Sequence, residues 1–172
     1  MSHTRRISRF RLALIICALA LGASAGAPSA QSRLLLFTPD EAARLRLGRE
    51  DLVVAEPRVR GTVGPRILVR EPAVRQTSDG PIIETTPATS FFIVFEANGS
   101  PVDMDSLEIK AKKGILSMSL TPRLKPFIEG TSLKADSISV PEGRFFIQIE
   151  VLDKAGARAV EKYRLDVRQL SS

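Results

Sequence analysis

From Pro65 onward, apolar and polar residues alternate along several segments of the chain. A period of two places one set of side chains in a core and the other in water, which is typical of antiparallel sheets with one solvated face. The clearest segments are Ile67–Val69, Phe91–Phe95, Leu107–Lys112, Phe145–Val151 and Lys162–Val167. The pattern predicts an all-β domain over residues 65–169, with about seven antiparallel strands packed as an immunoglobulin-like (Ig-like) sandwich.

Turn residues separate these segments. The predicted turns are Asn98-Gly99, Pro141-Glu142-Gly143 and the hairpin Asp153-Lys154-Ala155-Gly156. Glycine, asparagine and aspartate favour tight turns because they tolerate left-handed backbone angles or bond to nearby amides. The segment Pro122–Ile128 predicts a helical turn that crosses between sheets, with Leu124 and either Phe127 or Ile128 packed inward.

Residues 31–64 predict an N-terminal arm outside the sheets. Its helix start is Thr38-Pro39-Asp40-Glu41, in which Thr38 can cap the helix and Glu41 can complete a capping box. The helix is expected over Pro39–Leu47, followed by a linker. The arginines of the arm fit a strip that touches an anionic surface, or a solubilising lead-in, because acids are interspersed among them.

The first thirty residues are typical of an export signal. A cationic start holds four arginines, Leu12–Leu21 is an unbroken apolar run, and small residues follow. Cleavage is expected in the range 25–30, for example after Ala25 or Ala27. The alternative is an uncleaved membrane anchor, although the run is shorter than the roughly 20 residues of a spanning helix. The signal predicts a periplasmic or secreted protein.

Removal of the signal changes the composition. It takes away the only histidine, His3, and the only cysteine, Cys17, so imidazole and thiol catalysis, disulfides and Cys/His zinc sites are excluded from the mature chain. Four of the 25 basic residues precede residue 31, which leaves 21 against 19 acidic residues. So small an excess argues against a nucleic-acid partner.

Several of these motifs together resemble a known class of domain. They are Gly64–Ile67, Pro101–Leu107, Pro122–Ile128, Pro141–Phe145 and Asp153–Gly156. They are similar to single Ig-like domains of bacterial exported proteins, which resemble fibronectin type III and cadherin-like sandwiches. The resemblance implies a fold over residues 65–169 and an envelope or extracellular location, and it implies no reaction. The chain lacks the paired cysteines and the tryptophan of antibody-type domains.

Asp103 and Asp105 are the candidate metal ligands. Two carboxylates two residues apart in a predicted loop can offer oxygens to calcium, as cadherin-like sandwiches do, provided that others such as Glu96 or Asp153 join them. The alternative is turn chemistry, in which aspartate side chains accept hydrogen bonds from nearby amides. Calcium is the only cofactor that the sequence suggests.

Phe92, Val94 and Phe146 are the candidate partner surface. Each follows or precedes an inward-facing residue, so all three are expected to point outward and to form an apolar patch if their strands are adjacent. The alternative is that the arm, through Leu34–Phe37, folds back over this patch.

The pattern favours an exported, non-enzymatic interaction module of the bacterial envelope with a protein partner. No residue is predicted to be catalytic. A calcium- or glycan-binding accessory domain is the alternative, and a hydrolase with a carboxylate pair is the second alternative. Membrane contact is expected only through an uncleaved signal.

Overall fold

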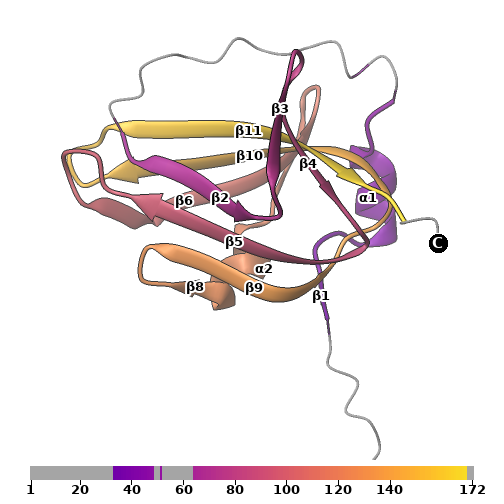
Figure 1. Ribbon diagram of the computed structural model, residues 1–172, viewed down its shortest axis with the longest axis horizontal. Helices are drawn as coiled ribbons and strands as arrows, with labels where there is room; N and C mark the ends of the chain where they lie inside the picture. Colours follow the sequence, from indigo (N-terminus) through magenta and orange to yellow (C-terminus); the bar gives the residue numbers. More distant parts are fainter. Residues whose placement is uncertain (1–32, 49–50, 52–63, 170–172) are drawn as a thin grey trace, which may run out of the picture. The chain divides into compact units, whose positions relative to one another are not determined.

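Two β-sheets make up most of the described chain in the computed structural model (Figure 1). The structure describes residues 33–48, 51 and 64–169. All of them belong to the compact unit Ser32–Ser172. The predicted signal over residues 1–30 and its cleavage site lie outside the described residues, as does most of the predicted linker.

The first sheet contains five strands. In the order of their pairing they are β1 (Leu34–Leu35), β9 (Ser132–Ser139), β5 (Ala88–Glu96) and β2 (Arg66–Glu71), and β8 (Ile128–Glu129) also pairs with β9. The pair β1–β9 is parallel and the other pairs are antiparallel. β2 is therefore one edge of this sheet.

The second sheet contains six strands. In order they are β3 (Val74–Thr77), β4 (Gly80–Thr85), β11 (Arg158–Val167), β10 (Gly143–Asp153), β6 (Val102–Lys113) and β7 (Leu116–Ser119). The pair β4–β11 is parallel. β3 and β7 form the two edges.

The predicted two-sheet sandwich is confirmed, whereas the strand number and the uniform antiparallel pairing are wrong. The described residues contain eleven strands, and two pairs are parallel. The unpredicted strands are short ones at or near sheet edges, such as β3, β7 and β8. Four residues or fewer show too little alternation to stand out in the sequence.

The predicted turns and crossover are present. β5 and β6 are joined through Asn98-Gly99, and β10 and β11 through Asp153–Gly156. The crossover begins as α2 (Thr121–Leu124) and continues as a 3-10 helix (Lys125–Phe127), linking β7 of one sheet to β8 of the other. Leu124 is buried, and Phe127 and Ile128 pack against the core.

The arm differs from its prediction because it is part of the fold. Its helix α1 (Pro39–Leu45) begins as expected, with a complete capping box between Thr38 and Glu41, and ends two residues earlier. The two residues of β1 pair with β9. Phe37 is fully buried, and its ring stacks on Phe145 of β10 with centroids 4.7 Å apart.

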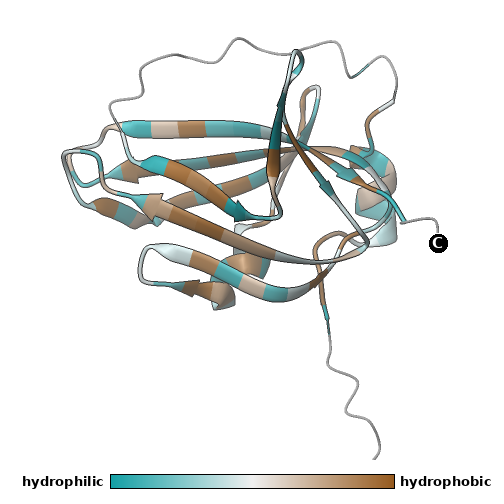
Figure 2. Ribbon diagram, in the orientation of Figure 1, coloured by the Kyte–Doolittle hydropathy of each residue, from teal (hydrophilic) through white to brown (hydrophobic). Residues whose placement is uncertain are grey.

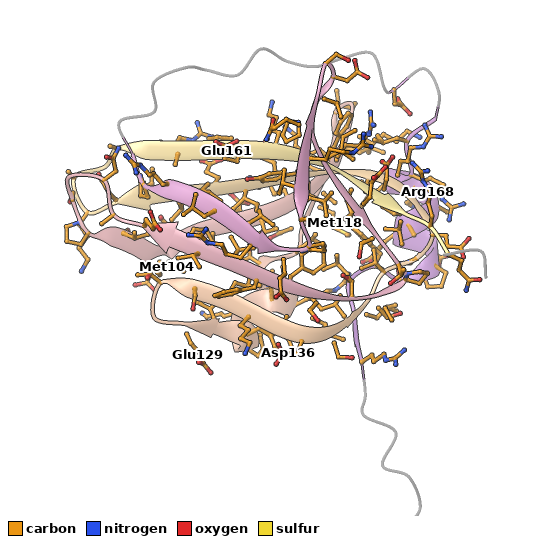
Figure 3. The ribbon with its side chains drawn as sticks, viewed as in Figure 1. Met104, Met118, Glu129, Asp136, Glu161 and Arg168 are labelled. Atoms are coloured by element: carbon orange, nitrogen blue, oxygen red, sulfur yellow. The ribbon has the colours of Figure 1, made fainter. Side chains whose placement is uncertain are left out.

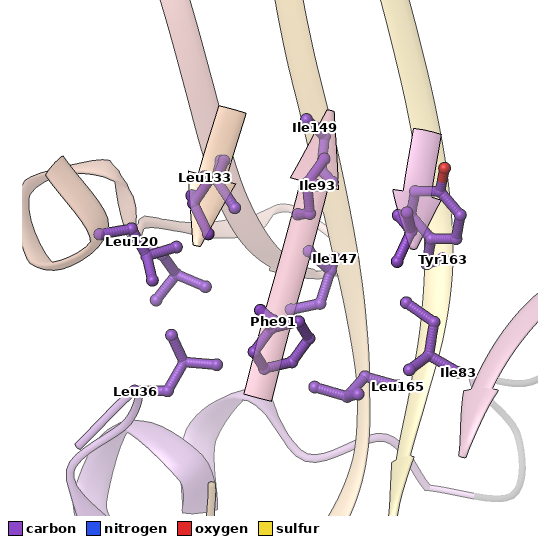
Figure 4. A pocket seen from close by; sticks show the side chains of 13 residues that line it. Leu36, Ile83, Phe91, Ile93, Leu120, Leu133, Ile147, Ile149, Tyr163 and Leu165 are labelled. Atoms are coloured by element: carbon purple, nitrogen blue, oxygen red, sulfur yellow. The ribbon is translucent and has the colours of Figure 1, made fainter. Parts of the chain in front are cut away.

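Apolar side chains from both sheets, α1 and α2 meet in one core. Figure 2 shows hydrophobic residues, in brown, along strands of both sheets. A cavity of about 30 Å³ remains between the sheets, and Figure 4 shows the side chains around it. Its lining is apolar and includes Leu36, Phe91, Leu120, Leu133, Ile147 and Leu165. A space of this size holds about one water molecule and is too small for an organic ligand.

Candidate functional site

The predicted partner surface does not form as one patch. Phe92 and Val94 lie on β5 of the first sheet, whereas Phe146 lies on β10 of the second. The prediction required adjacent strands, and these strands belong to different layers of the sandwich. All three side chains are half-buried. The arm does not cover them with Leu36 and Phe37, because those side chains are buried in the core.

Asp103 and Asp105 lie within β6 and not in a loop. The Asp103 side chain accepts a hydrogen bond from the Asp105 amide at 3.3 Å, which is the turn chemistry that the sequence offered as the alternative. Nearby Asp153 uses its carboxylate to accept from the amides of Ala155 and Ala157 in the hairpin. Among the described residues, no group of three or more metal-ligating side chains is found. The calcium site stays a prediction.

A groove at one end of the sandwich brings three arginines and one glutamate together. It has a volume of about 470 Å³ and opens to solvent. Its lining comes from the end of α1, the turn between β9 and β10, and the residues after β11. The lining residues are Arg46, Glu142, Gly143, Arg144, Val167, Arg168 and Gln169. Three of these side chains are guanidinium groups and one is a carboxylate, and we call the groove formed by these seven residues the arginine groove.

The side chain of Arg46 is held against the groove wall by the backbone of Glu142 and Gly143. Arg46 is the C-cap residue of α1, and its guanidinium donates a 2.7 Å hydrogen bond to the carbonyl of Glu142. The side chain crosses Gly143, where a Cβ atom would lie only 2.7 Å from Nε of Arg46. Gly143 also has a φ of 142°, which favours glycine. This glycine is therefore required both for the turn and for the position of Arg46.

Arg144 is the guanidinium that is available to a ligand. It follows Gly143 in β10 and is exposed, while its backbone carbonyl accepts from the amide of Leu47 and holds the strand against the end of α1. Within the described part of the chain, its side chain has no ion-pair or hydrogen-bond partner. A free guanidinium presents several donors in a planar fork that matches a carboxylate or a phosphate.

Arg168 is held by carboxylates beside the groove (Figure 3). Its guanidinium lies 3.2 Å from Asp166 and 3.5 Å from Glu84. Asp166 is only 3% exposed and also lies 3.2 Å from Nε of Arg164, without the alignment of a hydrogen bond. Because these carboxylates offset part of the charge of Arg168, Arg144 is the more strongly unbalanced cation of the groove.

A charged clamp holds α1, and with it Arg46, against the sandwich. Arg123 of α2 donates to both carboxylate oxygens of Glu41 at 2.8 and 2.7 Å, and also to the carbonyl of Leu36 at 2.7 Å. These bonds from Arg123, with the one from the Thr38 amide, lower the pKa of Glu41 from its ordinary 4.5 to about 2. Glu41 is thus ionised throughout the physiological range. The clamp connects the first turn of α1 to α2, which begins the crossover between the sheets.

A second bidentate pair lies on the outer face of the six-stranded sheet. Both carboxylate oxygens of Glu150 lie 2.6 Å from the Arg158 guanidinium, and this hydrogen bonding lowers the pKa of Glu150. Neither this pair nor the Glu41–Arg123 clamp lines the groove. Both are structural contacts between neighbouring elements.

The sequence did not predict the arginine groove. Arg46 precedes Arg144 by 98 residues and Arg168 follows Arg144 by 24, and the three meet only because α1 packs beside β10 and the end of β11. The arginines of the arm were noted as one strip, and Arg46 belongs to that strip. Arg144 and Arg168 carried no signal of their own, because single arginines on solvated strand positions are common.

Comparison with known proteins gives distant structural similarity only. No protein-family model and no curated protein matches the sequence. The crystal structure of CopC from Methylosinus trichosporium OB3b aligns over 62% of this chain and 100% of its own, with 14% identity and a TM-score of 0.33. A structure of murine CRIg aligns over 60% of this chain and 99% of its own, with 8% identity and a TM-score of 0.33.

No helix within the described residues has the length and apolar character needed to span a bilayer.

Proposed function

We propose that the chain is an exported, non-enzymatic, Ig-like interaction module of the bacterial envelope, and that it binds an acidic segment of a protein partner in the arginine groove. The observation that carries the proposal is the convergence of Arg46, Arg144 and Arg168 on one open groove. The export signal predicted for residues 1–30 supports the location. The absence of histidine and cysteine after residue 30 supports a binding role over a catalytic one.

The dimensions and chemistry of the groove fit a peptide carboxylate. A hollow of about 470 Å³ accommodates one or two side chains of a partner. Arg46 is pre-oriented by the carbonyl of Glu142, so that little side-chain entropy is lost when a ligand binds beside it. Arg144 has no competing carboxylate in the described residues and can pair with an incoming one. Glu142 on the rim is the one opposing charge of the lining, and it would repel a partner carboxylate placed directly beside it.

The test combines site-specific photo-crosslinking with charge reversal. A photoreactive residue replaces exposed Gln169 in the groove, and a second variant places it at exposed Lys134 on the other sheet. Irradiation of cells that export the full chain is expected to give a discrete protein adduct from position 169 only. Arg144→Glu should weaken partner binding at least about tenfold, because it leaves the partner's carboxylate facing a like charge.

Arg66→Glu is the matched control. Arg66 is exposed at the start of β2 and, like Arg144, has no side-chain partner in the described residues. Gly64, two residues earlier, packs on the backbone at Arg158, whereas the groove lies beyond the other end of β11. This control changes net charge equally and should leave the adduct intact. An adduct that is indifferent to Arg144→Glu, or no adduct from position 169, would contradict the proposal.

A further inference from the structure

The tip of the β6–β7 hairpin exposes two large apolar side chains. Ile115 is 101% exposed and Leu116 is 50% exposed. Leu35, at 41%, is the only other large hydrophobic residue of the described chain in this class. The exposure of Ile115 is not a by-product of packing, because a side chain in free solvent contributes nothing to the stability of the fold.

Ile115 occupies the second central position of the hairpin turn. The strands are joined by Gly114-Ile115, with Lys113 opposite Leu116 in the register. Gly114 has a φ of 54°, the left-handed conformation for which glycine is suited. Two-residue hairpin turns use glycine where φ is positive, and Gly114 meets that need at the first central position. The second position does not require an apolar residue, and the isoleucine there presents an apolar group to solvent.

The hairpin is anchored to the folded body and is basic. Nζ of Lys113 donates a 2.7 Å hydrogen bond to the carbonyl of Arg46, which fixes the base of the tip beside the end of α1. Lys112 lies opposite Phe146 of β10. Lys113 also lies 3.5 Å from the carboxylate of Asp51, and Lys110 lies 2.7 Å from that of Glu108. Lys112 is therefore the lysine of the hairpin without a carboxylate partner in the described residues. The tip combines an apolar point with this one cation set just behind it.

We propose that this tip docks the module on an anionic phospholipid bilayer, with Ile115 and Leu116 inserted among the headgroups and Lys112 facing lipid phosphates. A convex apolar point offers no groove for a peptide, but it enters the soft interfacial region of a membrane without needing a matching cavity. Long lysine side chains reach back to the headgroup level while their stems lie along apolar surface. Anionic lipid attracts each such cation further.

This inference goes beyond the proposed function and does not depend on it. The hairpin tip contributes no residue to the lining of the arginine groove. Because Lys113 binds the carbonyl of Arg46, which does line the groove, a docked tip would place the groove near the membrane surface. The sequence pattern predicted membrane contact only through the signal. It did not predict contact through Ile115, because the exposure of that residue depends on the pairing of β6 with β7.

The experiment uses the absence of tryptophan from the chain. The full chain is expressed with its leader and purified after export, so that every variant carries the same N-terminal region. Ile115→Trp provides a single fluorophore at the tip. Vesicles of phosphatidylglycerol and phosphatidylcholine in equal parts should shift its emission to the blue, and brominated acyl chains should quench it. Vesicles of phosphatidylcholine alone should give a much smaller effect, and high salt should weaken binding.

Flotation with the same vesicles tests the role of the apolar residues directly. The double variant Ile115→Ser/Leu116→Ser should bind at least about tenfold more weakly than the unmodified protein. Leu35→Ser removes an exposed apolar side chain elsewhere and should change binding less than about twofold. Because Ile115 and Leu116 contribute little burial, circular dichroism should show the double variant folded.

Two outcomes would overturn the inference. One is equal binding of the double variant and the unmodified protein, and the other is no binding of the unmodified protein to anionic vesicles. If the double variant instead loses the adduct formed at position 169 while vesicle binding is absent, the tip is a protein-docking element. Failure of the tip to bind lipid leaves the Arg144→Glu result unaffected, so the two proposals fail separately.

Discussion

The clamp between Glu41 and Arg123 should make a measurable, pH-dependent contribution to stability. The informative change is Glu41→Gln, because glutamine keeps the length of the side chain and can still complete the capping box at Thr38. It removes the charge while leaving Arg123 bonded to the carbonyl of Leu36. Substitution of Arg123 would also leave that carbonyl without its donor, and would mix two effects.

The magnitude follows from the pKa of Glu41. A fall from 4.5 to about 2 corresponds to at most about 3 kcal/mol of stability. Glu41 and Arg123 remain 27% and 31% exposed, so solvent screens the pair, and about 1–2 kcal/mol is the expected loss in Glu41→Gln at pH 7. The group has a lower pKa in the folded state than in the unfolded state. Its contribution is therefore complete above pH 4.5 and is lost as the pH falls toward 2.

The assay is urea unfolding followed by far-ultraviolet circular dichroism at pH 7, 5 and 3. The difference in unfolding free energy between Glu41→Gln and the unmodified protein should be largest at pH 7 and should shrink at pH 3. Glu129→Gln is the control. Glu129 ends β8 (Figure 3), and no side-chain ion pair is found for it within the described residues. A difference that does not change with pH, or one below about 0.3 kcal/mol at pH 7, would refute the reasoning.

Two further variants test the arm and the groove wall. Phe37→Ala removes a fully buried ring stacked on Phe145 and should lower the free energy of unfolding by about 3–5 kcal/mol in the same urea assay; a loss below about 1 kcal/mol would mean that the arm is not integral to the core. Gly143→Ala places a Cβ atom in the path of Arg46 at a φ that disfavours alanine, so it should cost at least about 1 kcal/mol and weaken the adduct from position 169; unchanged stability would contradict the described turn.

The sequence predicted the parts of the fold that depend on local chemistry. Thr38 and Glu41 begin a helix because their side chains satisfy amides only three residues apart, and Asp153–Gly156 turns because its carboxylate reaches its own hairpin amides. Inward positions such as Phe95 and Phe145 were also evident from alternation. These features require only the nearest residues and the polarity of the two faces.

Features that depend on distant pairing could not be predicted. β1 has only two residues and exists because β9 accepts it, so the arm was placed outside the sheets. Phe92 and Phe146 were expected on adjacent strands, but which sheet holds each strand depends on the full topology. The arginine groove depends on the same long-range pairing.

The stacking of Phe37 on Phe145 has a consequence for the order in which the fold can be completed. A ribosome delivers the N-terminal segment first, whereas its partner strands β9 and β10 emerge only near the end of synthesis. Until then β1 lacks its partner strand β9, and Phe37 lacks the ring of Phe145 on which it stacks. In a chain that ends before β10, the side chain of Phe37 therefore has no stacking partner. Closure of this sandwich is thus a late event, coupled to arrival of the final third of the polypeptide.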